Sequence, residues 1–236
     1  MRPEKYKKMA LILSLDTATK NCSVALSENG IVLESVDYNE GEFSHSEKLH
    51  VFIEDLCAKA GKKLQEIEAV AVSKGPGSYT GLRIGVSAAK GLCFGLDIPL
   101  ISVETLEVLC KTYVLENKVS NNDLLIPMLD ARRMEVYTAV FDTQFTKIKD
   151  TEALILKPNS YDHFLNTAHC HFIGDGAAKS KDLYQRENTS FSATTFPKAH
   201  AVAETIELKY QNKQFEDVAY FEPYYLKDFM DGKKKK

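Results

Sequence analysis

Apolar residues alternate or cluster in short runs at the start of the chain, which is typical of β-strands. Leu11–Leu15, Cys22–Leu26 and Ile31–Val36 are three such runs. The last two are separated by Asn29-Gly30, a pair that suits a tight hairpin turn because both residues accept positive φ. The pattern predicts three consecutive antiparallel strands.

The hydrophobic period then changes from two to about 3.6, which indicates helices. Ser44 and Glu47 fit a capping box. Behind them, one helical face gathers the apolar residues Leu49, Phe52, Ile53, Leu56, Cys57 and Ala60. Gly61 supplies a stop signal. We therefore expect an amphipathic helix over this segment.

The elements that follow alternate between strand and helix. We predict a strand at 67–72, a turn at 75–77, a helix at 79–96, a strand at 99–103 and a helix from 104. The order βββαβαβα, with parallel strands after the opening meander, is that of the α/β ribonuclease H-like fold shared by actin-like ATPases (ASKHA).

The second half of the chain has a weaker pattern. Strands are predicted at 124–129 and 136–141, a short helix after Gly176 and another helix at about 199–210. We expect two lobes, residues 1–112 and a smaller, reduced lobe of residues 113–236 with a basic tail. No internal repeat is visible.

Composition limits the classes of function. The formal net charge of the 236 residues is -3, although Lys233–Lys236 is a run of four positive charges. The rest of the chain is therefore acidic, which argues against a broad nucleic-acid surface. Five widely spaced cysteines are typical of reduced thiols in a cytoplasmic protein. No run approaches the roughly 20 apolar residues of a membrane span.

Several motifs resemble nucleotide-binding or metal-binding sites but lack residues that those sites require. The glycine-rich segment Gly75–Gly85 lacks the lysine of a phosphate-binding Walker loop, and Thr80 replaces a glycine of the dinucleotide fingerprint. His45 and His50 are five residues apart and point away from each other on a helix. The pair His169 and His171 lacks further ligands and is predicted to lie unpaired at the surface.

Asp16 ends the first strand, where actin-like ATPases place a functional carboxylate, but no second acid follows the fourth strand. A structural role in the turn is therefore the preferred interpretation. We predict no catalytic residue, no metal ligand and no cofactor.

The helix at 79–96 contains several interior glycines, each of which costs about 1 kcal/mol relative to alanine. Gly81, Gly85, Ala88 and Ala89 form one stripe of small side chains at helical spacing. The stripe packs either on the protein's own sheet or on a helix of another chain. We favour the partner, and so expect Gly85→Leu to weaken association while the monomer keeps its thermal stability.

Three segments together resemble the TsaB family, formerly YeaZ: Leu15–Thr19, Gly75–Gly85 and Pro223–Lys227. Lys227 is a departure, since the family pattern favours arginine there. The resemblance covers nearly the whole chain from Met9. It implies a degenerate, non-catalytic copy of the transferase TsaD. TsaD holds a metal through an H-x-x-x-H helix pair, whereas this chain has His45 but Leu49 four residues later.

The resemblance also implies partners. The helices matching 44–60 and 80–96 would form a bundle with a TsaD-like catalytic subunit, a TsaE-like ATPase would join the assembly, and the isolated chain would form a homodimer through the same faces. The function would be that of a scaffold for threonylcarbamoyl modification of tRNA, with indirect contact to the tRNA. The expected interface residues are Leu49, Phe52, Ile53, Gly81, Arg83, Gly85, Ala88, Ala89 and Leu92.

Two other functions stay open at this stage. One is a stand-alone enzyme, either metallopeptidase-like or an actin-like ATPase, which bound metal or nucleotide would favour. The other is a simple homodimeric binding module. Capture of a TsaD-like protein separates that module from the scaffold.

Overall fold

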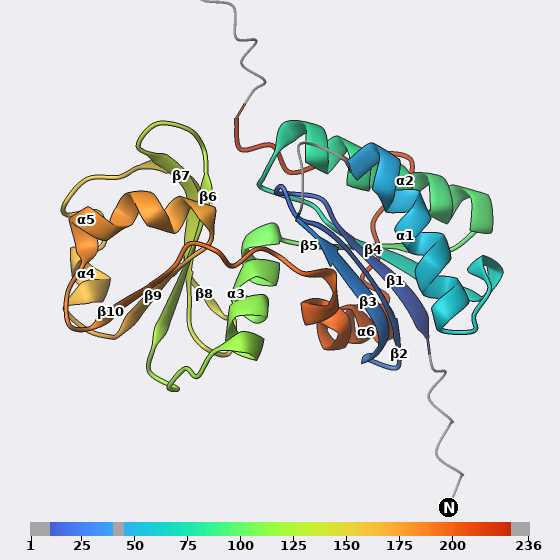
Figure 1. Ribbon diagram of the computed structural model, residues 1–236, viewed down its shortest axis with the longest axis horizontal. Coiled ribbons are helices and arrows are strands. Elements are labelled where there is room, and N and C mark those ends of the chain that lie inside the picture. The colour runs from blue at the N-terminus through green and yellow to red at the C-terminus, as the bar shows by residue number, and fades with distance from the viewer. Residues whose placement is uncertain (1–9, 40–44, 228–236) are drawn as a thin grey trace, which may run out of the picture.

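The computed structural model describes residues 10–39 and 45–227, which form two five-stranded sheets that lie side by side (Figure 1). The first sheet has the order β3-β2-β1-β4-β5. Its strands are β1 (Leu11–Asp16), β2 (Cys22–Glu28), β3 (Ile31–Tyr38), β4 (Ala69–Ser73) and β5 (Leu100–Val103). β1, β2 and β3 are antiparallel neighbours, and β4 and β5 are added in parallel. The predicted ASKHA-type α/β fold is confirmed.

The second sheet repeats this topology with the order β10-β9-β6-β7-β8. Its strands are β6 (Leu124–Asp130), β7 (Glu135–Phe141), β8 (Lys147–Ile155), β9 (Cys170–Ile173) and β10 (Thr189–Ser192). β6, β7 and β8 form the meander, and β9 and β10 are parallel to β6. This repeat was not predicted, because its trace in the sequence is short: Leu-Ile-x-x-Leu-Asp forms β1 and ends β6.

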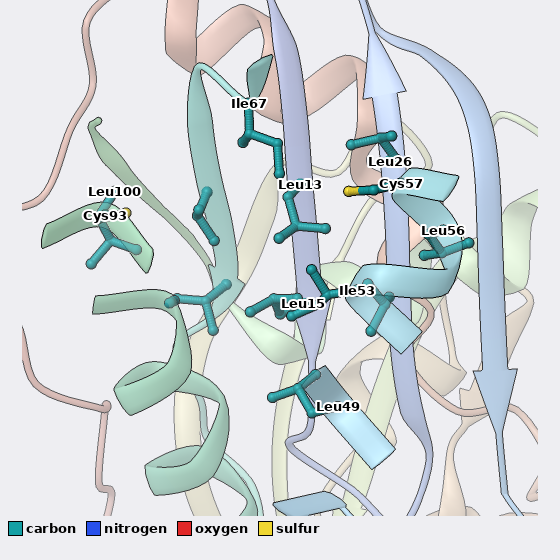
Figure 2. Packing of buried hydrophobic residues seen from close by; sticks show 14 of the residues in the cluster. Leu13, Leu15, Leu26, Leu49, Ile53, Leu56, Cys57, Ile67, Cys93 and Leu100 are labelled. Carbon is teal, nitrogen blue, oxygen red and sulfur yellow. The ribbon is translucent and has the colours of Figure 1, made fainter. Parts of the chain in front are cut away.

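Two helices cover one face of the first sheet. They are α1 (His45–Lys59) and α2 (Tyr79–Leu96), and they lie next to each other in Figure 1. Figure 2 shows Leu13 and Leu15 of β1 meeting Ile53 of α1 in the core between them. A fully buried leucine contributes about 1.5–3 kcal/mol to the stability. This cluster therefore fixes which face of α1 points inward. Ser44, the predicted cap, lies outside the described residues.

The opposite face of the first sheet is covered by segments far along the chain. Helix η3 (Ala199–Val202), a 3₁₀ turn, leads into α6 (Ala203–Gln211), and both pack there. Their Val202 and Ile206 share an apolar cluster with Ile12 and Ile101. The predicted continuous second lobe, residues 113–236, is thus corrected, because residues from 199 onward return to the first sheet.

Helix α3 (Thr105–Glu116) also disagrees with a boundary at residue 112. It continues past that point, and its Leu106 and Leu109 pack on Leu125 of the second sheet. The other face of that sheet is covered by short helices: α4 (Asp162–Leu165), η2 (Asp175–Ser180) and α5 (Lys181–Tyr184). A further 3₁₀ turn, η1 (Leu64–Glu66), precedes β4. No helix within the described ranges is long and apolar enough to cross a membrane.

The glycines in the first half of α2 face the protein's own sheet. The oxygen Oγ1 of Thr17, a buried residue just after β1, donates a 2.7 Å hydrogen bond to the carbonyl of Gly81. A Cβ on Gly81 would lie 2.0 Å from the Thr17 carbonyl oxygen, and one on Gly85 would lie 2.3 Å from Thr17 Oγ1. The stripe therefore packs within the chain, and the prediction that Gly85 faces a partner is wrong.

We accordingly expect Gly85→Ala to destabilise the monomer. The added methyl would displace the Thr17 hydroxyl from Gly81, and overpacking of this kind costs about 1–3 kcal/mol. The measurement is the thermal midpoint of the purified chain. Gly91→Ala is the control, since a Cβ there meets no atom within 4 Å, and it should raise stability by up to about 1 kcal/mol. Equal midpoints for both variants would contradict this packing.

Candidate partner-binding surface

The structure divides the nine predicted interface residues into two groups. Five are enclosed by the chain itself, which is a correction to the prediction for them, because their side chains cannot contact a partner: Leu49, Ile53, Gly81, Gly85 and Ala89. Phe52, Ala88 and Leu92 are half-buried against the same core. Arg83 is exposed. The other exposed residues on this side of α1 and α2 are ones that the sequence pattern did not single out.

The outer face of α2 carries a stripe of its own. Arg83, Ser87, Gly91 and Gly95 follow one another at intervals of four residues, and all four are exposed. Cβ atoms on Gly91 or Gly95 would find nothing within 4 Å. The ring of Phe94 lies beside them with 86% of its surface exposed. We call Arg83, Ser87, Gly91, Phe94 and Gly95 the outer stripe of α2.

Helix α1 adds to the apolar character of this side, with Val51 49% exposed. Phe52 is turned inward, and its ring lies 5.8 Å from that of Tyr38. Sequence reasoning missed Phe94 because α2 is apolar on nearly every face, so periodicity alone does not separate its inner from its outer side. The absence of charged residues after Lys90 was the one available signal.

The C-terminal segment 212–227 runs past α2 as a strap. Lys90 of α2 donates from Nζ to the carbonyl oxygens of Ala219, at 3.2 Å, and Phe221, at 2.9 Å. Farther along, the backbone N–H of Tyr224 donates to the Lys74 carbonyl at 2.7 Å. The motif Pro223–Lys227 thus lies at the start of α2 and holds the loop before it.

An aromatic and cationic cluster forms where the strap meets α2. The rings of Tyr79 and Tyr225 have centroids 4.9 Å apart, and the Arg83 guanidinium lies 5.0 Å from the Tyr79 ring centre. Cations attract the faces of aromatic rings, so these three side chains hold one another at the surface.

Asp16 is fully buried at the end of β1, and burial raises its pKa to about 7. Its Oδ2 accepts a hydrogen bond from the Ser73 hydroxyl at the end of β4, and its Oδ1 accepts one from the Ala18 N–H at 3.1 Å. The side chain therefore joins two strand ends. The predicted structural interpretation of Asp16 agrees with these contacts.

The equivalent position of the second sheet is arranged differently. Asp130 ends β6, and its backbone N–H donates to Asp175 Oδ1 at 2.9 Å. Lys179 Nζ lies 2.6 Å from Asp130 Oδ1 in an ion pair. Burial raises the pKa of Asp175. The acids at the strand ends are thus engaged within the chain.

The histidines are part of the chain's own hydrogen-bond network. His45 Nε2 lies 2.8 Å from the Thr19 carbonyl, and its Nδ1 has no partner. His171 is buried, not exposed as predicted, and bonds Asp123 through Nε2 at 2.9 Å and Ser190 through Nδ1 at 2.6 Å. Burial lowers its pKa. Within residues 10–39 and 45–227, no three His, Cys, Asp or Glu side chains form a group that could hold a metal.

Known proteins resemble this chain over most of its length. The family model of TsaD, tRNA N6-adenosine threonylcarbamoyltransferase, matches residues 39–233. The tRNA threonylcarbamoyladenosine biosynthesis protein TsaB of Haemophilus influenzae is 28% identical, over 94% of this chain and 96% of its own. TsaB of Escherichia coli is 36% identical over 62% of each chain.

A solved structure gives the same result. The crystal structure of an uncharacterized protein from Pseudomonas aeruginosa, described as similar to peptidase YeaZ, has a TM-score of 0.79 and 26% sequence identity. The match covers 93% of this chain and all of that one. The duplicated sheets, the glycine-mediated packing of α2 and these matches lead to one conclusion: the chain belongs to the TsaD family and, within it, to the TsaB (YeaZ) family.

Proposed function

We propose that this protein is a non-catalytic scaffold subunit of the machinery for tRNA threonylcarbamoyladenosine biosynthesis. It binds a TsaD-like catalytic subunit, with a TsaE-like ATPase in the same assembly. The outer stripe of α2 carries this proposal, because Phe94 is 86% exposed between two glycines with open space around them. The names of the relatives, TsaB proteins of this biosynthesis, support the pathway.

The chemistry of the outer stripe suits a helix of another chain. Glycines allow two backbones to approach closely, and the aromatic ring beside them supplies buried area on contact. Burying a phenylalanine side chain contributes about 1.5–3 kcal/mol. Aromatic residues surrounded by small neighbours are typical anchors of interfaces. Arg83 at the start of the stripe adds a charge that can select the partner's orientation.

In this proposal the same surface also mediates self-association of the isolated chain. A second copy can cover Phe94 and Val51 when no TsaD-like subunit is present, so homodimer and heterodimer compete for one face. Phe52, Ala88 and Leu92 lie half-buried along its inner border. In this proposal they support the contact, whereas Leu49, Ile53, Gly81, Gly85 and Ala89 act only through the fold.

The arrangement of Asp16 supports a non-catalytic role. A carboxyl group that is buried, with its pKa near neutrality and both oxygens hydrogen-bonded inside the chain, is poorly placed to hold a cation. Asp16 lies at the strand end where actin-like ATPases place a functional carboxylate, but here its side chain stabilises the fold.

Phe94→Asp tests the interface. Because Phe94 is 86% exposed, the substitution should change the free energy of unfolding by no more than about 0.5 kcal/mol. Loss of an anchor worth about 2 kcal/mol should raise the Kd for the cognate TsaD-like subunit by about thirtyfold. Isothermal titration calorimetry measures this Kd, and sedimentation of the isolated chain should show a matching shift toward monomer.

Leu115→Asp is the matched control, since Leu115 is a 65% exposed apolar residue on another helix, α3. It should leave both associations unchanged. Wild-type affinity of the Phe94→Asp variant for the TsaD-like subunit would remove the outer stripe from the interface and with it the basis of this proposal.

Asp16→Asn tests the structural role of the acid. With a folded pKa of about 7, Asp16 keeps its proton in the folded chain at pH values where the unfolded chain has lost it. The wild type should therefore lose stability as pH rises from about 4 to about 7 through this group. Asparagine is the neutral isostere and should lack this loss. Its thermal midpoint relative to wild type should thus be higher at pH 8 than at pH 5.

A relative midpoint that falls between pH 5 and pH 8 would mean that the ionised carboxylate is the stabilising form. Asp142→Asn is a suitable control, because Asp142 caps an exposed turn and is not buried. The same pair of midpoints is measured for this variant, which separates the loss of a carboxylate as such from the loss of the buried one.

A further inference from the structure

The turn between β6 and β7 holds two arginines in an unfavourable backbone conformation. Arg132 has φ 71° and Arg133 has φ 51°, and both are exposed. The left-handed region favours glycine and asparagine, because a Cβ clashes there with the backbone. Residues in such conformations cluster at functional sites, and Arg132 and Arg133 are the only adjacent non-glycine pair with positive φ among the described residues. The turn therefore displays two guanidinium groups where packing alone would select small residues.

The positive charge of these arginines is not compensated locally. Asp130, before the turn, pairs with Lys179 at 2.6 Å, and Glu135, after it, pairs with Lys227 of the strap. Within the described part of the chain, neither Arg132 nor Arg133 forms an ion pair. The two carboxylates nearest the turn are thus already neutralised by lysines, and the guanidiniums are free to bind an anion.

The strap connects the turn to the aromatic cluster at the start of α2. Lys227 contacts Glu135, while the ring of Tyr225, two residues earlier, packs at a tilt against Tyr79 beside Arg83. Figure 1 shows the end of the strap passing between α2 and the second sheet. Lys233–Lys236, the predicted basic tail, lies outside the described residues.

We infer that this surface binds RNA directly. We call Arg132, Arg133, Lys227, Tyr79, Arg83 and Tyr225 the turn-strap surface. The guanidinium groups of Arg132 and Arg133 contact phosphates, and the Tyr225 ring, which is 37% exposed, offers a stacking face to an unpaired base. The inference rests on the proposed function, which makes a tRNA the relevant polyanion. The acidic net charge of the chain favoured indirect contact with tRNA. A ligand, however, responds to the charge of the surface that it meets and not to the net charge of the chain.

RNA fits this surface better than an anionic membrane does. Peripheral membrane binding uses an apolar wedge beside the cations. Here the exposed apolar side chain of the turn is Met134 alone, and the strap contributes tyrosines. Stacking of bases on aromatic rings is sequence-tolerant and suits Tyr225, whose ring has Tyr79 as a neighbour at 4.9 Å between centroids.

The double variant Arg132→Asn/Arg133→Gly separates binding from folding. It removes both charges and places residues that tolerate positive φ at both positions, so its thermal midpoint should equal or exceed that of the wild type. The full chain is titrated into a fluorescently labelled, unmodified tRNA transcript at several salt concentrations. We expect about tenfold weaker binding, with the slope of log K against log salt reduced by about two.

Lys118→Gln/Lys213→Asn is the matched control. It removes two exposed charges that follow α3 and α6, and Lys213 also has a positive φ of 55°. This variant should bind the transcript as the wild type does. Equal loss in both double variants, or unchanged binding by Arg132→Asn/Arg133→Gly, would overturn the assignment. Binding to phosphatidylserine vesicles that competes with the transcript would also overturn it in favour of a membrane.

Arg83 is common to the outer stripe of α2 and the turn-strap surface, but Arg132 and Arg133 lie outside the outer stripe, so the two variants separate RNA binding from subunit binding. Arg132→Asn/Arg133→Gly should capture the TsaD-like subunit with unchanged affinity, whereas Phe94→Asp should lose capture and keep RNA binding by the isolated chain. Loss of capture in the arginine variant would place the turn in the protein interface instead and refute the RNA inference.

Discussion

The contact between Thr17 and the first turns of α2 is the constraint on which the functional surface depends. The hydroxyl of Thr17 bonds the Gly81 carbonyl, and the N–H of Ser78 donates to the Ala18 carbonyl at 2.7 Å. Only glycine at 81 and 85 permits this approach of helix to loop. Once this side of α2 is held against the sheet, the opposite side must face solvent. The position of Phe94 follows from that packing and not from any local property of its own segment.

The two sheets share one strand order but differ in the environment of the acid that ends β1 and β6. In the first sheet Asp16 has become a buried link to Ser73, with a pKa raised by its surroundings. In the second, Asp130 lies at the surface and pairs with Lys179. The same strand order therefore tolerates a buried acid with a raised pKa at one position and an exposed, ion-paired acid at the other. Burial of the surrounding apolar strands is common to both and maintains the fold.

The strap links the two halves of the molecule. It follows α6 on the first sheet, is held there by Lys90 and Lys74, and ends at Glu135 on the second sheet. Segments that are distant in sequence, residues 79–83, 132–135 and 224–227, thereby form one surface. Its local charge differs in sign from the net charge of -3, because the charge that a ligand meets depends on which side chains the fold brings together.

The sequence by itself determined the elements whose signals are local. The Asn29-Gly30 hairpin, the helix from Tyr79 to Leu96 and the order of strands and helices in the first half were predicted correctly, since turn chemistry and periodicity act over a few residues. The edge strands β8 and β10 were missed. The start of β8 is mostly polar, with Lys147 and Lys149 among its residues, so it lacks a clear apolar pattern. β10 is only four residues long. Only the tertiary structure decided the rest: the return of residues 199–227, the burial of Gly85 and the exposure of Phe94. A helix that is apolar on several sides contains no local information about which side is buried, because that choice is made by contacts between residues far apart in the chain.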